Sequence, residues 1–318
     1  VAVLFSGDIL HGISGLKKTI LAIIFFWVLN CVDSKSRDFL LKTLFVSALI
    51  AASYGVLQAI SAGVSEGSRV SGTMSIYMTF AGVLMLVLLM AFSRILFYSY
   101  KDPLALSVGT LLTICLFLTL TRQAWLGVMA GGVFLLFIRQ KKLIFLAPLI
   151  ISIVVALSPQ AVKDRVISMA NLKDRTLGIR MELWSGGWEI FKDNPIIGCG
   201  FKCVDKVYSN YPKHAEILGK YKGLHNNFLQ LGVDVGFLGL SAWIGIWAAF
   251  FIKIYRRKPS LDDETRWIFL GSVAATIGFL SGGFFEVNFY DSEVIMLMYF
   301  LMALPFASKK MGDEQKTA

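Results

Sequence analysis

The stretch YKGLHNNFLQLG, residues 221–232, places a histidine and two asparagines directly before a long apolar run. A neutral imidazole can accept a proton near pH 7, so His225 is a candidate general base. The alternative is structural, because Asn226 and Asn227 are of the residue type that caps the N-terminus of a helix. Both interpretations need a helix that enters an apolar environment just after His225.

A second candidate, Arg122, lies between two apolar stretches in LFLTLTRQAWLGVMAGG, residues 116–132. An arginine at mid-membrane costs about 2.5–3.5 kcal/mol on insertion scales, so it usually has a partner or a function. We therefore favour a functional role for Arg122. The alternative is an arginine at the membrane boundary that extends to lipid phosphates.

Arg180 lies in a longer polar stretch that contains several other cations. Guanidinium groups bind phosphate oxygens in a bidentate way and stay charged, so a phosphate-bearing substrate is one interpretation. Attraction to anionic lipid headgroups is the other, and these residues alone favour it slightly. The neighbouring cations, expected to form one basic surface, are Arg165, Lys173, Arg175 and Lys192.

Further polar residues stand near other apolar runs. Arg69 lies in SRVSGTMSIYMTFAG, residues 68–82, and three carboxylates, Glu286, Asp291 and Glu293, bracket a short connection near the C-terminal end. Carboxylates there could position a hydroxyl, but we expect them to solvate a loop. The sequence contains no Asp-x-Asp pair, no phosphate-binding glycine loop and no H-E-x-x-H motif, which gives little support to a metal-dependent nucleotide-sugar enzyme.

The composition indicates that membrane helices position these residues. The chain has 318 residues, of which 56% are hydrophobic and 16% charged, and its mean hydropathy is +0.67. So apolar a chain cannot hide its surface in one soluble core, which is typical of a polytopic membrane protein. Because the sequence begins within an apolar stretch, VAVLFS at 1–6, we expect that part of an N-terminal helix precedes it.

Nine apolar runs approach the length that spans a membrane as a helix. They are 19–32, 39–63, 76–97, 104–121, 123–138, 143–157, 228–252, 266–285 and 290–306. Most of the basic connections then fall on one side, which the positive-inside rule places in the cytoplasm, although Lys17 and Lys18 go against the rule. The long stretch 158–227, which ends just before the run that follows His225, is thereby placed outside.

The predicted fold is all-α, a polytopic transmembrane helical bundle with one large periplasmic loop that contains short amphipathic helices. We expect N-terminal transmembrane helices over 1–157, a periplasmic loop with catalytic residues over 158–227, and C-terminal transmembrane helices with a cytoplasmic tail over 228–318. In RMELWSGGWEIF, residues 180–191, large apolar residues recur at helical spacing, which indicates an amphipathic helix at the membrane interface. The Pro and Gly of DNPIIGCG, residues 193–200, should end it.

The four cysteines give two expectations. Cys31 and Cys115 lie in apolar runs and are expected to be small core residues. Cys199 and Cys203 lack a second Cys or His pair at zinc-ligand spacing. A local disulfide between them is an open alternative if this loop is periplasmic.

Taken together, four motifs resemble the O-antigen ligase and O-antigen polymerase superfamily of bacterial inner-membrane glycosyltransferases. They are RVSGTMSIYMTFAG (69–82), LTRQAWLG (120–127), GIRMELWSGGWEIFKDNPIIGCGF (178–201) and LHNNFLQLGVDVGFLGL (224–240). Each motif alone is weak, but their order is specific, and the resemblance covers about residues 65 to 300. One departure is that Ser75 and Ile76 stand where relatives often have His or Asn after the G-T motif.

The resemblance implies an O-antigen ligase-like glycosyltransferase that uses no metal or other cofactor. It would move a glycan from undecaprenyl diphosphate to a lipid A-core sugar hydroxyl at the periplasmic face of the inner membrane, and would invert the anomeric centre. Matched motif to motif, Arg122 and Arg180 would contact the carrier diphosphate, and His225 would take the hydroxyl proton. Arg69 and Asn226 are additional candidates for substrate contacts.

Several alternatives stay open. The expected partners are the lipid-linked glycan, the acceptor glycan and membrane lipids, with no nucleic acid. Within the enzyme class, an O-antigen polymerase or a protein O-oligosaccharyltransferase would use the same motifs with another acceptor. A transporter or flippase for lipid-linked sugars is the alternative from a different class, although no internal repeat of the kind common in transporters is visible.

Overall fold

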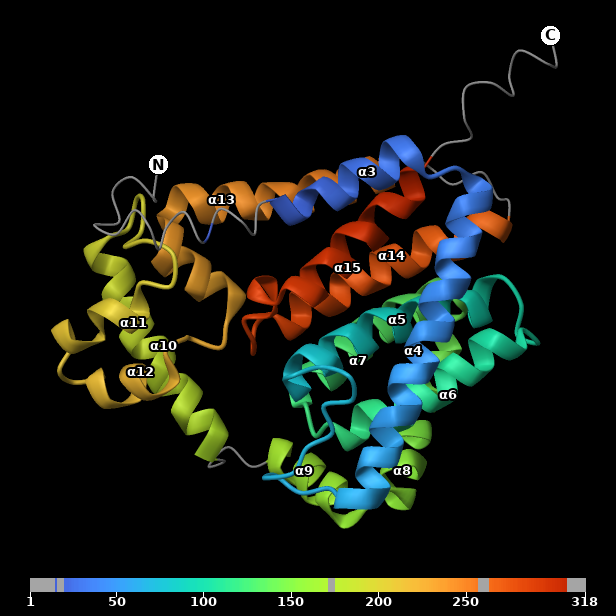
Figure 1. Ribbon diagram of the computed structural model, residues 1–318, viewed down its shortest axis with the longest axis horizontal. Helices are drawn as coiled ribbons and strands as arrows, with labels where there is room; N and C mark the ends of the chain where they lie inside the picture. Colours follow the sequence, from blue (N-terminus) through green and yellow to red (C-terminus); the bar gives the residue numbers. More distant parts are fainter. Residues whose placement is uncertain (1–14, 16–19, 171–174, 257–262, 308–318) are drawn as a thin grey trace, which may run out of the picture. The chain divides into compact units, whose positions relative to one another are not determined.

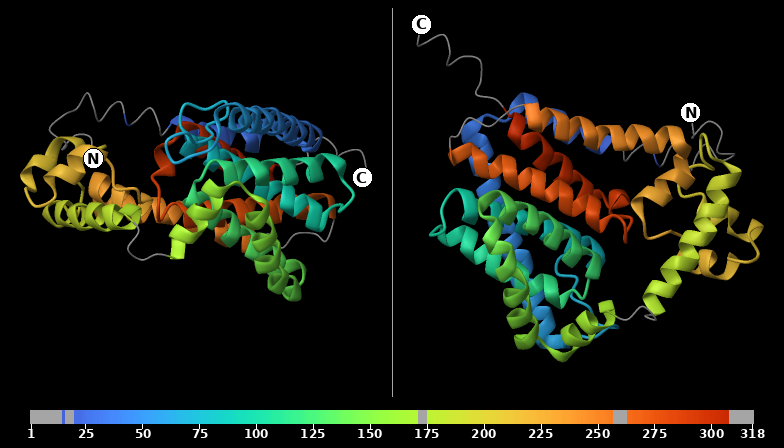
Figure 2. Two further views of the ribbon diagram at one scale, coloured as in Figure 1. Left: turned by 90° about the horizontal axis from the view of Figure 1, so that it is seen from below. Right: turned by 180° about the vertical axis from the view of Figure 1, so that it is seen from behind.

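The computed structural model describes residues 15, 20–170, 175–256 and 263–307, and within them it contains helices and turns but no strand (Figure 1). The further views in Figure 2 show the same for these residues, so the all-α prediction is confirmed for them. Some predictions lie outside the described residues: those on the N-terminal VAVLFS, on Lys17 and Lys18, on Lys173 and on the tail from 308 onward.

Each of the nine apolar runs overlaps a helix. In chain order these are α3 Ile23–Cys31, α4 Ser34–Ala62, α5 Tyr77–Phe97, α6 Pro103–Leu118, α7 Arg122–Arg139, α8 Ala147–Leu157, α13 Asn227–Arg256, α14 Asp263–Gly282 and α15 Ser292–Ala303. Of the described helices, α4, α5 and α13 are long and apolar enough to cross a membrane, and Ile20–Cys31, Pro103–Leu118 and Ser292–Phe306 are shorter apolar helices. The protein thus has the features of a membrane protein, while the nine-span topology, its orientation and the periplasmic loop stay predictions.

The described residues form further helical elements outside these nine helices. They are η1 Ile20–Ala22, η2 Lys141–Leu146, α9 Gln160–Ala170, α10 Arg175–Asp193, α11 Val204–Val207, η3 Tyr208–Asn210, α12 Ala215–Tyr221, η4 Asn288–Tyr290 and η5 Leu304–Phe306. Helix α10 ends at Asp193, just before the Pro and Gly residues that were predicted to end it.

The chain divides into two compact units, each of which is described by itself. The first, called the α13 unit, comprises Val1–Leu21, Ser168–Arg256 and Gly282–Ser292. The second, called the α5 unit, comprises Ala22–Ile167, Arg257–Ser281 and Glu293–Ala318. The division into 1–157, 158–227 and 228–318 that the sequence predicts has no test here and stays a prediction.

Helix α5 forms the centre of its unit and packs against α4, α6 and α7. Small residues let α7 approach α14 closely. A Cβ atom added to Gly127 would lie 2.7 Å from the carbonyl oxygen of Gly278, and one added to Gly131 would lie 2.6 Å from that of Ala274. Such spacing of small residues is common where membrane helices pack. It fixes the direction in which α7 leaves its first residue, Arg122.

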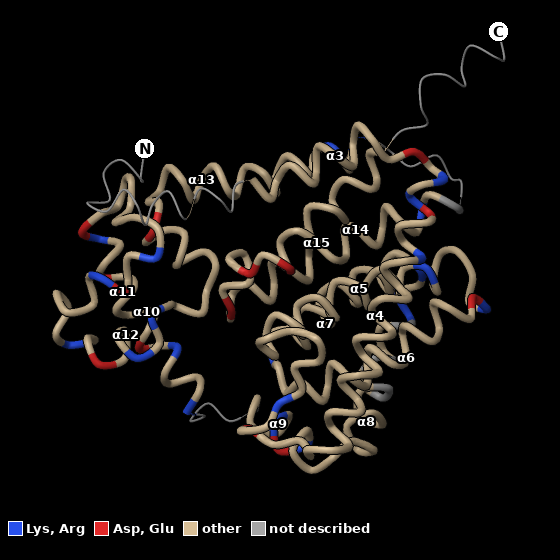
Figure 3. The backbone as a smooth tube through the Cα atoms, viewed as in Figure 1, with Lys and Arg blue, Asp and Glu red and all other residues tan. Residues whose placement is uncertain are grey.

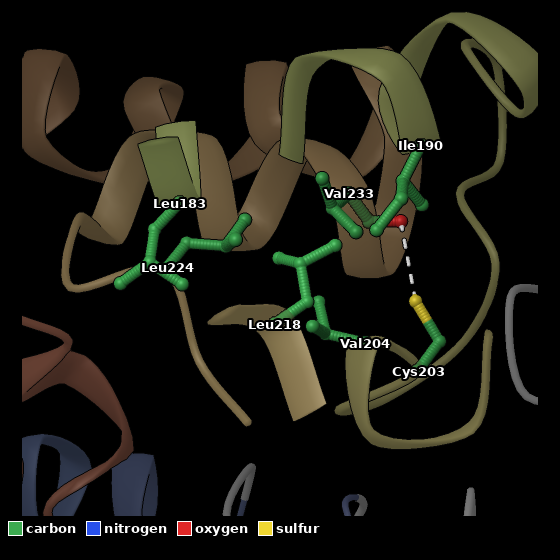
Figure 4. Close-up of a cluster of buried hydrophobic side chains, with 7 residues drawn as sticks. All are labelled: Leu183, Ile190, Cys203, Val204, Leu218, Leu224 and Val233. Carbon is green, nitrogen blue, oxygen red and sulfur yellow. Dashed lines mark hydrogen bonds between the residues drawn. The ribbon is translucent and has the colours of Figure 1, made fainter. Parts of the chain in front are cut away.

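The core of the α13 unit forms on one face of α10. Its buried residues Leu183, Gly186, Gly187 and Ile190 recur at intervals of three and four, whereas Met181 and Trp188 are exposed. The buried face packs against side chains from α11, α12, the turn after α12 and α13 (Figure 4), namely Val204, Leu218, Leu224 and Val233. The predicted amphipathic helix is therefore present, and its place at a membrane interface stays a prediction.

Helix α13 bends at Gly236, whose φ of +67° lies outside the helical range. The segment after α10 fills the break, because the carbonyl oxygens of Pro195 and Ile196 accept hydrogen bonds from the backbone N–H groups of Phe237 (2.7 Å) and Leu238 (3.2 Å). A side chain at Gly236 would collide with the Ile196 carbonyl oxygen. After the bend, α13 carries no charge until Lys253 (Figure 3), as a helix in lipid requires.

Candidate functional site

His225 lies in the short turn between α12 and α13, and α13 begins at Asn227, one residue before the apolar run predicted over 228–252. The backbone of His225 is left-handed, with φ of +46°. Such a conformation is uncommon for residues other than glycine and costs on the order of 1–3 kcal/mol, so surrounding contacts must hold it. The side chain keeps 24% of its surface exposed, which leaves the imidazole within reach of a substrate.

The imidazole faces the carboxylate of Glu286, which lies in the turn after α14. The distance from His225 Nδ1 to each of the two carboxylate oxygens is 3.2 Å. A carboxylate at this position accepts a hydrogen bond from Nδ1–H, and this tautomer leaves Nε2 free to accept a proton. The expectation that Glu286 solvates a loop was wrong, because its residue is only 8% exposed and is paired with His225.

Arg180, from α10, lies near the same pair. Its guanidinium carbon is 5.8 Å from the ring centroid of Phe285, the residue before Glu286. Burial on its own raises the pKa of Glu286. The hydrogen bond and charge of His225, the backbone N–H of Val287 and the charge of Arg180 outweigh burial, so the pKa is lowered and Glu286 is an anion at neutral pH.

The two asparagines after His225 have different roles. Asn226 caps α13, because its side-chain oxygen accepts hydrogen bonds from the backbone N–H groups of Phe228 (2.9 Å) and Leu229 (3.0 Å). Asn227, which was also considered as a cap, is fully buried and ties α13 to the next turn. Its side-chain amide donates to Asn288 at 2.5 Å, and its side-chain oxygen accepts from the backbone N–H of Phe289 at 3.1 Å.

Helix α10 also holds the turn that carries His225. The indole N–H of Trp184 donates to the carbonyl oxygen of Leu224 at 2.9 Å. Gly187 lies so close that an added Cβ would meet a Leu224 methyl at 2.6 Å. Thus the α10 motif that supplies Arg180 also contacts the backbone next to His225.

The structure therefore brings together three of the predicted site residues, His225, Arg180 and Asn226, within the α13 unit. It adds Glu286, whose contact with His225 the sequence analysis did not predict. In the sequence, Glu286 is recognisable only as a single carboxylate after the apolar and glycine-rich stretch SGGFF, residues 281–285. Nothing in that stretch indicates that its partner is His225, 61 residues away.

Arg122 and Arg69 belong to the α5 unit. Arg122 is the first residue of α7, is 9% exposed and has interactions within the structure. This burial agrees better with a partnered arginine than with one that extends to lipid phosphates. Arg69 donates from Nε to the Glu66 carbonyl oxygen at 3.1 Å, and its guanidinium lies 4.7 Å from the centre of the Tyr77 ring.

Arg165 differs from its prediction. It was expected to contribute to a basic surface, but it is only 7% exposed, so that expectation was wrong. Its guanidinium donates to a carboxylate oxygen of Glu66 at 2.7 Å and to the carbonyl oxygen of Leu120 at 3.3 Å. Leu120 has a left-handed backbone, with φ of +52°, and precedes Arg122 by two residues. Arg165 thus supports the turn from which Arg122 leaves.

Cys199 and Cys203 are paired as a disulfide, with Cα atoms 5.7 Å apart. Backbone hydrogen bonds tie this loop to α13: Cys199 N–H donates to the carbonyl oxygen of Val233 at 2.9 Å, and Gly200 N–H donates to that of Asp234 at 3.0 Å. Among the described residues, no three His, Cys, Asp or Glu side chains gather as a set of metal ligands.

Residues 106–244 match the family model described as O-Antigen ligase. The match includes Arg122, Arg180 and His225, whereas Arg69 and Glu286 lie outside it. No curated protein matches the chain. The resemblance that the motifs indicated is therefore confirmed for this region, although the predicted extent of about 65 to 300 was longer. Over residues 106–244, the chain carries a domain of the O-antigen ligase family.

Proposed function

We propose that this protein is a glycosyltransferase that moves a glycan from undecaprenyl diphosphate to a sugar hydroxyl of a lipid A-core. The family match supports a transfer enzyme of the O-antigen ligase and polymerase type. The observation that carries the proposal is the pairing of the partly exposed imidazole of His225 with the buried carboxylate of Glu286. This is the arrangement expected of a general base that is oriented by a carboxylate.

In the proposed step, the acceptor hydroxyl attacks the anomeric carbon of the lipid-linked glycan. His225 Nε2 takes the hydroxyl proton while the new carbon–oxygen bond forms, and Glu286 stabilises the imidazolium that results. The bond between the anomeric carbon and the phosphate oxygen breaks, and undecaprenyl diphosphate leaves with the electron pair. A base in this role typically contributes about 10²–10⁴-fold to the rate. Attack from the face opposite the leaving group inverts the anomeric centre.

Fixed cations would stabilise the departing diphosphate. Arg180 lies beside the His225–Glu286 pair, and a guanidinium can hold two phosphate oxygens at once. Charge that is fixed before the reaction stabilises a developing anion without reorganisation, so no step of this proposal requires a metal. For Arg122, the same role is proposed from its place in the LTRQAWLG motif, and its burial at the start of α7 is consistent with that role.

The Cys199–Cys203 disulfide supports a periplasmic location for the site. Disulfides form and persist in oxidising compartments, of which the bacterial periplasm is one. The loop that carries this disulfide is hydrogen-bonded to Val233 and Asp234 of α13, eight and nine residues after His225. We therefore propose that the protein lies in the inner membrane and that this end of α13 faces the periplasm.

The proposal can be tested with the purified protein in proteoliposomes that contain an undecaprenyl-diphosphate-linked glycan and a lipid A-core. We expect glycan on the core with wild-type protein and none with His225→Ala, which should still insert and elute as a folded protein. Near-normal transfer by His225→Ala would refute the assignment of the base.

The product also distinguishes the alternatives. A longer glycan on the carrier would indicate a polymerase, and glycan on an added acceptor protein would indicate a protein O-oligosaccharyltransferase. Movement of the carrier lipid across the bilayer without transfer would indicate a transporter. Each of these outcomes would replace the ligase proposal.

A further inference from the structure

Asp234 is a fully buried carboxylate in α13, a helix that is apolar enough to cross a membrane. The proposed reaction does not use it directly. An ionisable residue in such a helix is costly and is generally retained for a specific purpose, with identifiable partners. Its partners in the α13 unit come from three different segments of the chain.

The first partner leads to the turn that carries His225. Gln230, which is 2% exposed, donates from its side-chain amide to Asp234 Oδ1 at 3.1 Å. The side-chain oxygen of the same Gln230 accepts a hydrogen bond from the backbone N–H of Leu224 at 2.9 Å. Because Asp234 fixes which end of the Gln230 amide faces Leu224, it helps to hold the backbone that enters the left-handed residue His225.

The second partner leads to the turn that carries Glu286. The hydroxyl of Tyr290 donates to Asp234 Oδ2 at 2.5 Å. Tyr290 ends η4, and the same short element is held by the buried pair of Asn227 and Asn288. The position of η4 relative to α13 is thereby fixed, and with it the turn from which Glu286 reaches the imidazole.

The third set of partners lies in the disulfide loop. The backbone N–H groups of Lys202 and Cys203 hydrogen-bond to the Asp234 carboxylate. The carbonyl oxygen of Asp234 accepts from the N–H of Gly200 at 3.0 Å. The groups that contact the Asp234 carboxylate, from Gln230, Tyr290 and the disulfide loop, all donate hydrogen bonds to it. A carboxylate only accepts, so it can satisfy all of these donors.

We propose that Asp234 is a positioning residue for the His225–Glu286 pair, because its carboxylate holds the turn before His225 and the turn after Glu286 in one buried network. The catalytic part of this inference rests on the proposed function. An asparagine at this position would keep the shape but replace one accepting oxygen by an NH2 group. Toward Gln230 or the loop N–H groups, this NH2 group would place donor against donor, and toward Tyr290 it would make the hydroxyl accept and lose its own acceptor, so the present network could not stay intact.

Two variants test this inference. We expect Asp234→Asn to lower the transfer kcat by about 10- to 100-fold with little change in the KM for the lipid-linked donor, since displacement of a catalytic group by about 1 Å can cost that much. The matched control is Asp193→Asn, which removes the carboxylate from an exposed pair with Tyr211 (2.6 Å) in the same unit and should stay within twofold of wild type. If Asp234→Asn does not fold, Tyr290→Phe removes only one donor and should lower kcat by about 3- to 10-fold.

A second measurement does not depend on transfer. Diethyl pyrocarbonate modifies accessible neutral imidazoles, and mass spectrometry resolves each histidine. With Asp234→Asn, or with Tyr290→Phe if Asp234→Asn does not fold, we expect the modification rate of His225 to rise at least threefold. The rate of His214, which is 4% exposed and lies outside the network, should not change. An unchanged His225 rate, or wild-type kcat in the variant, would overturn the inference. Inactive wild-type protein with a raised His225 rate in the variant would instead refute the proposed function and retain the structural network.

Discussion

The turn before α13 and the turn before α7 place candidate residues at the start of apolar helices in similar ways, but they are held differently. His225 is itself left-handed, and Leu120, two residues before Arg122, is left-handed as well. In both turns a tryptophan indole donates to a nearby carbonyl oxygen: Trp184 to Leu224 at 2.9 Å, and Trp125 to Leu116 at 3.1 Å.

The two turns differ in how far apart in the sequence their contacting residues lie. The turn at His225 is held by Trp184 of α10, by Glu286 and by the Gln230–Asp234 network, so several segments contribute. The turn at Arg122 contains local hydrogen bonds, such as that from Thr119 Oγ1 to the Leu116 carbonyl oxygen at 2.7 Å. A long-range hydrogen bond also reaches this turn, from Arg165 Nε to the carbonyl oxygen of Leu120. The turn at His225 should therefore be sensitive to substitutions in several distant segments, and the turn before Arg122 to substitution of Arg165.

The largest effect is expected where the long-range support of His225 is removed. Glu286→Gln should lower transfer kcat by about 100-fold or more, because the neutral amide no longer selects the Nδ1–H tautomer or stabilises the imidazolium. The donor KM should change little, because Glu286 is not proposed to contact the donor. Steady-state kinetics in proteoliposomes check this, with Glu293→Gln, an exposed carboxylate nearby in sequence, as the control. A loss that appears only in KM would contradict the orienting role.

A smaller effect is expected when the long-range support of Arg122 is removed. Arg165→Met keeps a long side chain but loses the hydrogen bonds to Glu66 and Leu120, and we expect about a 10-fold loss of transfer. The side chain of Glu66 is 72% exposed, so the substitution leaves no buried unpaired carboxylate. Lys163→Met, on the same helix, is the control. If Arg165→Met is fully active, the turn at Arg122 is held by its local contacts alone.

The pH dependence of stability tests the contact between Glu286 and His225. The folded-state pKa of Glu286 is lowered from 4.5, so its interactions stabilise the fold above that pH and are lost as the pH falls through the lowered pKa. The melting temperature of Glu286→Gln should therefore be below that of wild type at neutral pH, with a difference that shrinks below about pH 4. Thermal unfolding in detergent at several pH values measures this. A difference that grows on acidification would show that the pKa of Glu286 is raised rather than lowered.

The smallest effect is expected at the disulfide. It closes a short loop, and backbone hydrogen bonds from Cys199 and Gly200 already hold that loop against α13. We expect Cys199→Ser with Cys203→Ser to change transfer by no more than about twofold, because the turn at His225 keeps its other contacts. The same result is expected for wild type under reductant. A loss as large as that of Glu286→Gln would mean that the disulfide is a main support of the site.

Much of the helical framework follows from the sequence because it depends on local patterns. The apolar runs, the stripe of Leu183, Gly187 and Ile190 on α10, and the Pro and Gly residues after Asp193 each indicate structure within a few residues. The motif residues Arg180 and His225 could be found in the same way, from residue type and neighbours.

The contacts that give these residues their geometry could not be predicted, because they join distant segments. Glu286 looks like a loop carboxylate until the fold brings it to His225, 61 residues away. Arg165 looks like part of a basic surface until Glu66, 99 residues away, pairs with it. No pattern near His225 or Leu120 predicts the positive φ that each residue adopts.

The most direct test of the central claim is a double-mutant cycle on the transfer rate of purified protein, with His225→Ala, Glu286→Gln and the two combined. If Glu286 acts by orienting His225, the combined variant should be no slower than His225→Ala alone, because the orienting group has nothing left to orient. If the two losses multiply instead, Glu286 contributes independently of His225, and the assignment of an oriented general base at this turn is wrong.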